Sequence, residues 1–301
     1  MQCFHPVRIR DPNNETETIS VPCGHCFACQ SNRRKDWHMR IKYELLHNVC
    51  SYTVTLTYDN EHLPKPVLFG EADILHTGYK ELDDAAFEEH MDTIGFYYHP
   101  YDVRDVQLFF KRLRKNGLKF RYFGVAEYGG KRARPHYHII FFFDYYISKV
   151  KFQTLVVNQW PCGHEIVVDE TDDACIGYTL KYCLKFYNVR QPQPKIFLSK
   201  RPFIGNGYFT SSTVEYLRLH PGDVVPTIVG RLRLPRLFRE KLYDDDMKAS
   251  NHDLLMLSMS KMEFEESKKA SELGISLEEY RSRLRQSFTN RCIQSIKKKS
   301  L

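Results

Sequence analysis

The alternation of apolar and polar residues predicts a strand at residues 50–58, which read CSYTVTLTY. Successive side chains of a strand point to opposite faces, so Tyr52, Val54, Leu56 and Tyr58 share one face. Further strands are expected at residues 118–127, 135–144 and 165–168. Apolar residues spaced three and four apart predict helices at residues 32–47, 103–116, 148–160 and 173–188. This order is typical of an α+β fold with helices on one face of a central antiparallel sheet.

The segments on either side of this region differ from it in composition. A cysteine-rich loop spans residues 20–30, and the chain beyond Leu237 is charged and predicted to be mostly helical. We therefore expect three parts: a Cys-rich N-terminal segment with its helix at 1–48, a central domain at 49–204, and a C-terminal, mainly helical extension at 205–301. Pro and Gly residues within 59–100 predict a long surface insertion there.

Composition limits the class of protein. The chain has 301 residues, of which 42% are hydrophobic, and this excludes a disordered chain and a collagen-like one. No run approaches the roughly 18 apolar residues of a membrane span, and the N-terminus does not resemble a signal peptide. We therefore expect a protein that is made and kept in a cytoplasm and has no membrane partner.

Charge is unevenly distributed along the chain. The net charge is +7, but residues 59–100 hold ten acids against two lysines, whereas residues 101–202 hold eighteen Lys and Arg against nine acids. A basic central region favours a polyanionic partner, and nucleic acid is the commonest one. A solvated charged surface without a partner is the alternative.

The strand that contains RPHYHIIFFFD, residues 134–144, carries the most informative motif. His136 and His138 point to the same face, and Tyr137 points to the other. If the preceding strand pairs with this one across their basic turn, Glu127 lies opposite His136. Two imidazoles and a carboxylate with open positions suit a Mg²⁺ or Mn²⁺ ion that also holds a phosphate oxygen. A pair of ordinary surface histidines is the alternative.

The helix predicted at 173–188 carries a second motif. At about 100° per residue, Ile176 and Leu180 fall on one side, with Tyr178 and Tyr182 on the other. Lys181 and Lys185 share the tyrosine side. A phenol oxygen can attack a DNA phosphodiester, form a phosphotyrosine and expel a 3′-hydroxyl. A nearby cation must help, because a phenol with a pKa near 10 is a weak nucleophile at neutral pH. An amphipathic surface helix with ordinary tyrosines is the alternative.

Three cysteines near the N-terminus have the spacing of metal ligands. Cys23, Cys26 and Cys29 form C-x₂-C-x₂-C, and a structural Zn²⁺ site would need a fourth ligand. Cys3 is the leading candidate for that position. The other candidates are His5, His25, Cys162 and His164. An iron–sulfur cluster and free thiols are the alternatives. Basic residues follow the cysteines at Arg33, Arg34, Lys35 and Arg40, where they could contact phosphates.

Taken together, these motifs resemble a known family. TVTLTYDNEHLP, EYGGKRARPHYHIIFF and GYTLKYCLK, in this order, are similar to motifs of the replication initiator proteins of small single-stranded DNA phages, closest to the gokushovirus branch of the microviruses. CFHP, VPCGHCFACQSNRRKDWHMR, WPCGHEIVV and RPFIGNGYF extend the resemblance over about residues 1–210. These initiators are HUH endonucleases, named for His–hydrophobic–His, and Tyr137 stands at the middle position here.

The resemblance implies a fold, an activity and partners. The fold would be the RRM-like or ferredoxin-like central sheet of HUH endonucleases, and the activity rolling-circle initiation: nicking of the viral origin, a 5′-phosphotyrosine link, and later cleavage and rejoining of the displaced strand. His136 and His138 would bind the metal, Tyr178 and Tyr182 would be nucleophiles, and Lys181 would match the lysine between them. Partners would be origin DNA, as duplex replicative form and as single strand, and host replication proteins, in the cytoplasm of a bacterial host.

Other assignments follow from the residues. Glu127 as third metal ligand rests on strand geometry together with the acidic ligands of related enzymes. Lys131, Arg132 and Arg134 in the basic turn, together with Arg33 and Arg34, are candidate DNA contacts. A zinc-containing single-stranded DNA-binding protein without catalysis is the alternative function, since stacking and phosphate contacts need no nucleophile. An HUH transposase or relaxase would share the chemistry, although paired tyrosines argue against single-tyrosine transposases.

Overall fold

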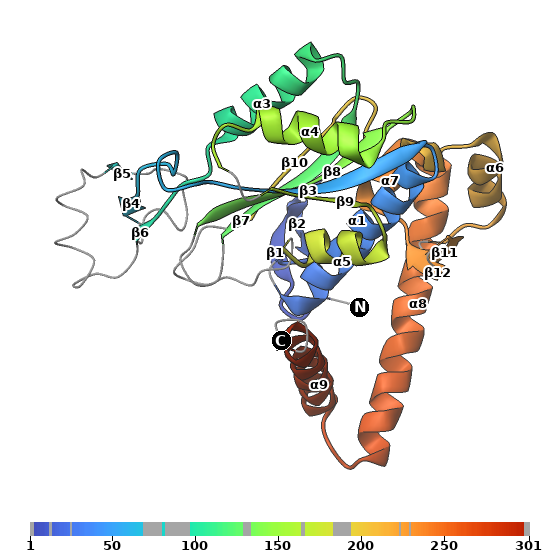
Figure 1. Ribbon diagram of the computed structural model, residues 1–301. Coiled ribbons are helices and arrows are strands. Elements are labelled where there is room, and N and C mark those ends of the chain that lie inside the picture. The colour runs from blue at the N-terminus through green and yellow to red at the C-terminus, as the bar shows by residue number, and fades with distance from the viewer. Residues whose placement is uncertain are drawn as a thin grey trace. The chain divides into compact units, whose positions relative to one another are not determined.

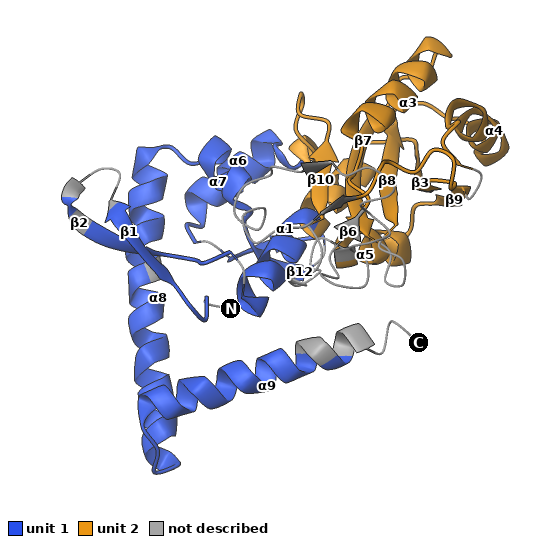
Figure 2. Ribbon diagram, turned by 90° about the vertical axis from the view of Figure 1, so that its left-hand side faces the viewer, with its two compact units in different colours: residues 1–37, 208–301 blue, residues 38–207 orange. Residues whose placement is uncertain are grey.

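The computed structural model describes most of the chain. The described residues are 3–11, 14–24, 26–68, 80–81, 97–128, 134–163, 166–182, 194–222, 224–228 and 230–297. The chain divides into two compact units (Figure 2). The sheet unit is His38–Gly207, and the terminal unit combines Met1–Trp37 with Tyr208–Leu301. The predicted domain boundaries at 48/49 and 204/205 stay predictions.

A five-stranded antiparallel sheet forms the centre of the sheet unit (Figure 1). Its strand order is β10-β7-β8-β3-β9, and all four pairings are antiparallel. The strands are β3 (Cys50–Thr57), β7 (Arg121–Tyr128), β8 (Pro135–Phe143), β9 (Ile166–Glu170) and β10 (Lys195–Leu198). The predicted α+β class with a central antiparallel sheet is therefore confirmed, and the predicted strands 50–58, 118–127, 135–144 and 165–168 all occur with small shifts of their ends. The edge strand β10 was not predicted.

One face of this sheet holds the main hydrophobic core. Tyr52, Val54 and Leu56 of β3 are buried there, as their alternation predicts. Helices α3 (Val103–Lys115) and α4 (Lys149–Gln159) cover this face (Figure 1). They contribute the buried side chains Val106, Phe109, Phe110, Leu113, Phe152 and Val156. Gly117, at a φ of 84°, follows α3, because its lack of a Cβ allows this left-handed conformation.

The opposite face is also covered, which differs from the predicted arrangement with helices on one face. Helix α5 (Asp173–Tyr182) lies on this side (Figure 1), where Tyr178 contacts His138 of β8. The C-terminal half of α1 (Phe27–Leu45) joins it through an ion pair between Glu44 and Arg121 of β7. The reason can be read from β7 and β8, whose side chains are buried on both faces, so that each face needs a cover.

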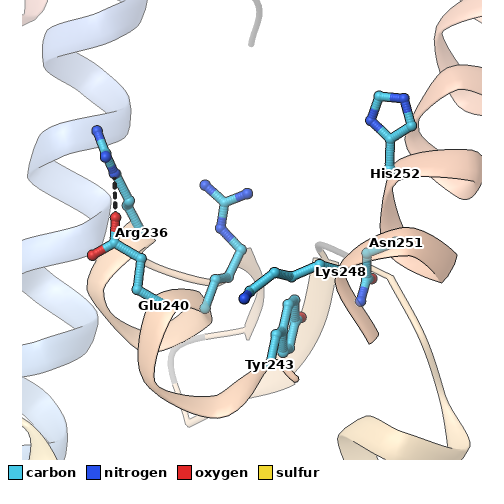
Figure 3. A pocket seen from close by; sticks show the side chains of 7 residues that line it. Arg236, Glu240, Tyr243, Lys248, Asn251 and His252 are labelled. Carbon is cyan, nitrogen blue, oxygen red and sulfur yellow. Dashed lines mark hydrogen bonds and ion pairs between the residues drawn. The ribbon is translucent and has the colours of Figure 1, made fainter. Parts of the chain in front are cut away.

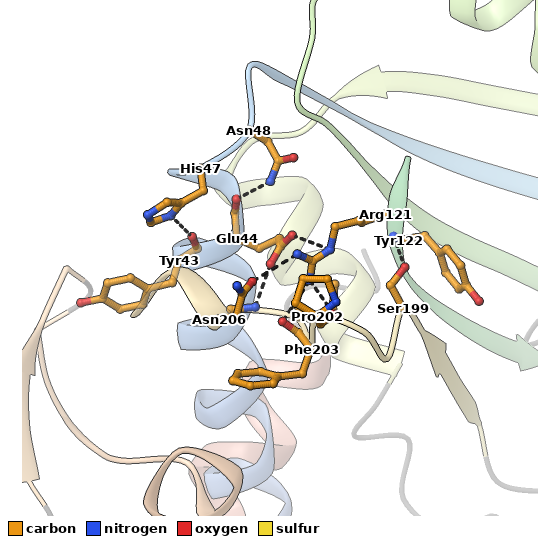
Figure 4. A network of polar contacts seen from close by, with 12 residues as sticks. Tyr43, Glu44, His47, Asn48, Arg121, Tyr122, Ser199, Pro202, Phe203 and Asn206 are labelled. Carbon is orange, nitrogen blue, oxygen red and sulfur yellow. Dashed lines mark hydrogen bonds and ion pairs between the residues drawn. The ribbon is translucent and has the colours of Figure 1, made fainter. Parts of the chain in front are cut away.

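A buried polar network fixes α1 on the sheet (Figure 4). Glu44 Oε1 lies 3.1 Å from Arg121 Nε, and Glu44 Oε2 accepts a hydrogen bond of 2.8 Å from the backbone N–H of Gly205. Arg121 also donates to the carbonyls of Pro202 and Phe203, each at 2.9 Å, and to the side chain of Asn206. The network therefore joins α1, β7 and the segment after β10.

Removal of the Glu44 carboxylate tests this network. We expect Glu44→Ala to lower the free energy of unfolding by about 3 kcal/mol, because it leaves a partly buried guanidinium and a buried N–H without their partner. Urea unfolding followed by circular dichroism measures this difference. Asp173→Asn is the matched control, since it removes the exposed ion pair with Lys42 and should cost less than about 1 kcal/mol. Equal effects of the two substitutions would contradict the prediction.

The remaining elements of the sheet unit belong to the predicted insertion. Short strands β4 (Val67–Leu68), β5 (Lys80–Glu81) and β6 (Tyr97–Tyr98) pair as a small antiparallel sheet. Residues 69–79 and 82–96, which hold most of the acids of the insertion, lie outside the described residues.

The terminal unit is mostly helical after its N-terminal hairpin, as predicted for the C-terminal extension. Its strands are β1 (Val7–Asp11), β2 (Asn14–Val21), β11 (Val224–Thr227) and β12 (Gly230–Arg233). Its helices beyond the 3₁₀ turn η2 (Asn206–Tyr208) are α6 (Ser211–Leu219), α7 (Arg236–Leu242), α8 (Asp245–Glu272) and α9 (Leu277–Lys297). The hairpins β1-β2 and β11-β12 were not predicted. Within the part of the chain that is described, none of the helices has the length and apolar character needed to cross a membrane.

Candidate metal and nucleophile site

The site is built on the sheet face that α5 covers, where β3, β7 and β8 run side by side. Residue 127 pairs with residue 136 across β7 and β8, as strand geometry predicts. His138 pairs with Val125 on one side and with Thr55 on the other. The alternation of β8 therefore brings both histidines to one face, and β7 brings Glu127 beside them.

Threonines of β3 orient both imidazole rings. The hydroxyl oxygen of Thr55 lies 3.0 Å from His138 Nδ1, and that of Thr57 lies 3.0 Å from His136 Nδ1. Because Nδ1 of each ring is held by a hydroxyl, Nε2 is the nitrogen that would bind a metal. Neither threonine was among the predicted site residues. Their signal was present in the sequence, since a regular antiparallel pairing of β3 with β8 places a residue of TVTLT opposite each histidine.

Glu127 and His138 form the buried centre of the site. Glu127 Oε1 lies 3.5 Å from His138 Nε2, and the two residues are only 4% and 3% exposed. A buried carboxylate requires a compensating cation or proton donor. Two ligands of one Mg²⁺ ion, each about 2.1 Å from it, lie about 3 Å apart, so the observed spacing suits a shared ion. The donor set of two imidazoles and a carboxylate therefore fits a divalent cation.

Tyr178 brings the helix motif to this centre. Its ring meets the His138 ring edge-on, with the centroids 5.3 Å apart and the planes at 88°. Ile176 and Leu180 are fully buried beneath α5, whereas Tyr178 is 50% exposed. The phenol therefore lies beside a metal-ligand candidate and remains accessible to a large substrate such as DNA.

The other residues of the tyrosine helix are less fully described. Lys181 is half-buried on α5. Tyr182 is the last residue of α5, and its side chain lies outside the described part of the chain, as does the whole of Lys185. Their roles stay predictions.

Two further phenols near the histidines serve the structure instead. Tyr137 points to the core face, where its hydroxyl lies 3.0 Å from that of Tyr58 and donates to the carbonyl of Asp102. Tyr58 donates in turn to Asp105, at 2.8 Å. Burial raises the pKa of Tyr58 and of Tyr137 well above the usual value, so both remain protonated hydrogen-bond donors. These phenols are therefore unsuited to act as nucleophiles.

The predicted DNA contacts fare differently from one another. Lys131 and Arg132 lie outside the described residues. Arg134 donates to the carbonyl of Tyr58 at 2.6 Å and to Asn60, so it ties the start of β8 to the end of β3. Arg33 is exposed and Arg34 half-buried on α1, in the terminal unit. Arg40 is buried and donates to the carbonyl of Ile204, so the expectation that it contacts phosphates is wrong.

The predicted cysteine ligands come together in the terminal unit. Cys3, Cys23, Cys26 and Cys29 have their Sγ atoms within 4.8 Å of one another, which selects Cys3 among the candidate fourth ligands. Of the alternatives, Cys162 is buried in the core of the sheet unit, and His25 and His164 lie outside the described residues.

A basic pocket of about 340 Å³ was not predicted (Figure 3). It is lined by Arg236, Arg239, Glu240, Tyr243, Lys248, Asn251 and His252 of the terminal unit. Two of its cations are already paired, Arg236 with Glu240 at 2.6 Å and Lys248 with Asp245 at 2.8 Å. We therefore assign no function to this pocket.

Comparison with known proteins identifies relatives of the chain. A profile of the replication-associated protein ORF2 family matches residues 51–187. The replication-associated protein ORF2 of Spiroplasma virus 4 is 32% identical over 243 residues, which cover 74% of this chain and 68% of that protein. The replication-associated protein ORF4 of Chlamydia phage 1 is 25% identical over 57% of this chain, and the match spans only 40% of that longer relative.

Among solved structures, hypothetical protein ORF119 from Sulfolobus islandicus rod-shaped virus 1 matches 52% of this chain and 99% of its own, with 14% identity and a TM-score of 0.27. The sequence relationships are the stronger finding. They place the matched motifs, the histidine strand and the tyrosine helix, within the aligned family region 51–187. The chain therefore belongs to the family of phage replication-associated proteins, as its resemblance to the replication initiators of microviruses implies.

Proposed function

We propose that this protein initiates rolling-circle replication by nicking one strand of a phage origin through a tyrosine nucleophile, and that it later cleaves and rejoins the displaced strand. Membership of the replication-associated family supports a role in replication. The observation that carries the nicking chemistry is the contact between Tyr178 and His138, with Glu127 beside the same imidazole.

In the proposed reaction, the Tyr178 oxygen attacks the scissile phosphorus in line. A P–O bond to tyrosine forms, the P–O3′ bond breaks, and the leaving 3′ oxygen takes up a proton while the phenol loses its own. The product is a 5′-phosphotyrosine and a free 3′-hydroxyl. Because the new bond is still a phosphodiester, attack by a 3′-hydroxyl reverses the step and joins strands.

His136, His138 and Glu127 are the residues that would hold a Mg²⁺ or Mn²⁺ ion. When bound, the ion supplies charge neutralisation at the phosphate in the transition state. Thr55 and Thr57 keep the imidazoles oriented, and the half-buried Lys181 adds positive charge on the helix that carries the tyrosine.

Two tyrosines one helical turn apart suit a reaction that needs two cleavages. The first tyrosine would hold the 5′ end while the second cuts the regenerated origin after a round of synthesis. Tyr178 and Tyr182 lie four residues apart on α5, which places their Cβ atoms about 6 Å apart. Origin DNA is accordingly the proposed substrate, and host replication proteins in a bacterial cytoplasm are proposed partners.

Mapping of the covalent adduct tests this function. The full chain is incubated with a labelled single-stranded oligonucleotide that contains the phage origin, in Mg²⁺ or Mn²⁺, and the linked peptide is sequenced by mass spectrometry. We expect a peptide from α5 that carries a nucleotide on Tyr178 or Tyr182. Binding to the oligonucleotide without cleavage in either metal would instead support the alternative, a DNA-binding protein without catalysis.

A further inference from the structure

Four thiols from two separate stretches of chain meet in the terminal unit. Cys3 Sγ lies 3.5 Å from Cys23 Sγ and 3.8 Å from Cys26 Sγ, and Cys29 completes the group. All four cysteines are free and partly buried. A tetrahedral Zn²⁺ ion with Zn–S bonds of about 2.3 Å holds its sulfurs about 3.8 Å apart, close to the spacings seen here. Disulfide sulfurs would lie about 2 Å apart.

The backbone around the thiols is arranged as a thiolate site requires. The N–H groups of Phe4 and Cys26 donate to Cys26 Sγ and Cys23 Sγ, each at 3.4 Å, and that of Cys23 donates to Cys3 Sγ at 3.2 Å. N–H donors of this kind stabilise the negative charge of thiolates. Gly24, with a φ of 78°, makes the tight turn between Cys23 and Cys26, a conformation that other residues rarely adopt.

We propose that Cys3, Cys23, Cys26 and Cys29 bind one Zn²⁺ ion as a closed structural site. Four protein sulfurs fill the tetrahedral shell, which leaves no position for a substrate or a reactive water. Each thiol gives up its proton to solvent on binding, so the centre carries a net charge of −2. The site lies outside the proposed nicking chemistry and does not depend on it.

The surroundings of the site indicate what the ion holds in place. The Phe4 ring packs edge-on against Phe288 of α9, with centroids 5.7 Å apart. A pocket of about 250 Å³ lies between Cys3 and Phe4 on one side and helices α8 and α9 on the other. Three arginines of α9, Arg281, Arg285 and Arg291, line this pocket and complement a dianionic centre.

Helix α9 is itself fixed to α8, because Arg281 pairs with Glu266 at 2.7 Å and with Glu263 at 3.2 Å. Zinc would therefore join the first residues of the chain to its last two long helices. Loss of the ion should release the N-terminal segment and, with it, the Phe4–Phe288 contact.

Metal analysis of the full chain tests the proposal. We expect native mass spectrometry and elemental analysis to find one zinc per chain in protein purified without chelators. The double substitution Cys23→Ser, Cys26→Ser should remove it, whereas Cys50→Ser, which changes a thiol outside the cluster, should retain it. Cobalt exchanged into the wild-type site should give the intense visible absorption of tetrahedral thiolate coordination.

Hydrogen exchange tests the structural consequence. Removal of the ion from wild-type protein by a chelator should speed amide exchange in residues 3–11 and in α9, and this comparison stands even if the double cysteine variant fails to fold. Phe288→Ala should speed exchange in the same segments while one zinc is retained. Wild-type protein that contains no zinc when grown with it, that retains zinc after the double substitution, or that contains iron with labile sulfide would overturn the proposal.

Discussion

Replacement of both Tyr178 and Tyr182 by phenylalanine is expected to lower the yield of covalent protein–DNA adduct by at least about 1,000-fold, because no phenol oxygen then remains on α5 to attack the phosphate. Phenylalanine keeps the ring of Tyr178 that meets His138, so packing should change little. The measurement is denaturing electrophoresis of the protein with a labelled origin oligonucleotide in Mn²⁺ or Mg²⁺.

The single substitutions give this experiment its resolution. If Tyr178 makes the first attack on the oligonucleotide, Tyr178→Phe alone should lose most of the adduct and Tyr182→Phe should retain it. Tyr146→Phe is a matched control, since Tyr146 is a highly exposed phenol outside the site and its loss should leave the yield unchanged. Undiminished adduct in the double variant would reject a nucleophile on α5.

The parts of the fold that could be predicted are those fixed by strand periodicity. In β3 and β8 the alternation of side chains is strict, so a sequence reading places Leu56 in the core and His138 on the other face. Pairing of neighbouring strands across a short turn then gave the opposition of Glu127 and His136. These inferences are local, and local geometry is what the order of residues determines most directly.

Other features depend on contacts between distant segments. Strand β10 is four residues long, and it becomes part of the sheet only by pairing with β7, some seventy residues earlier. Similarly, Arg40 looks like a surface cation in SNRRKDWHMR, but the carbonyl of Ile204 and a covered sheet face bury it. Propensity carries little information on such pairings, because tertiary packing decides them.

The site itself combines both kinds of information. The pattern of residues 173–188 predicted that the tyrosines lie opposite the apolar side of the helix, and Ile176 and Leu180 are indeed buried. That α5 covers the histidine face and brings Tyr178 to His138 was beyond periodicity, because a helix can pack on either side of a sheet. The threonines that hold the imidazoles show the same limit, since their role requires the register of β3 against β8.

Replacement of His138 by glutamine is expected to lower the rate of origin cleavage by at least about 100-fold while leaving most of the DNA binding. Loss of a residue that merely orients a metal ligand costs about 10- to 100-fold, and loss of the ligand should cost more. Binding depends on basic surfaces and should weaken with salt in both proteins alike. Cleavage under single-turnover conditions and filter binding measure the two quantities.

Glutamine rather than alanine is the appropriate replacement because Glu127 is buried beside His138, and a side-chain amide can still donate to that carboxylate. Thr55→Val, which removes the hydroxyl at His138 Nδ1, should have a smaller effect, about 10-fold, and higher Mn²⁺ should partly restore its rate. His220→Ala, on a histidine at the end of α6, should leave cleavage unchanged. If His138→Gln lost binding and cleavage in parallel, the residue would act in DNA recognition; if cleavage persisted, the metal would have to be held elsewhere. Only a selective loss of cleavage, graded from Thr55 to His138, agrees with an imidazole that holds a cation beside the attacking phenol.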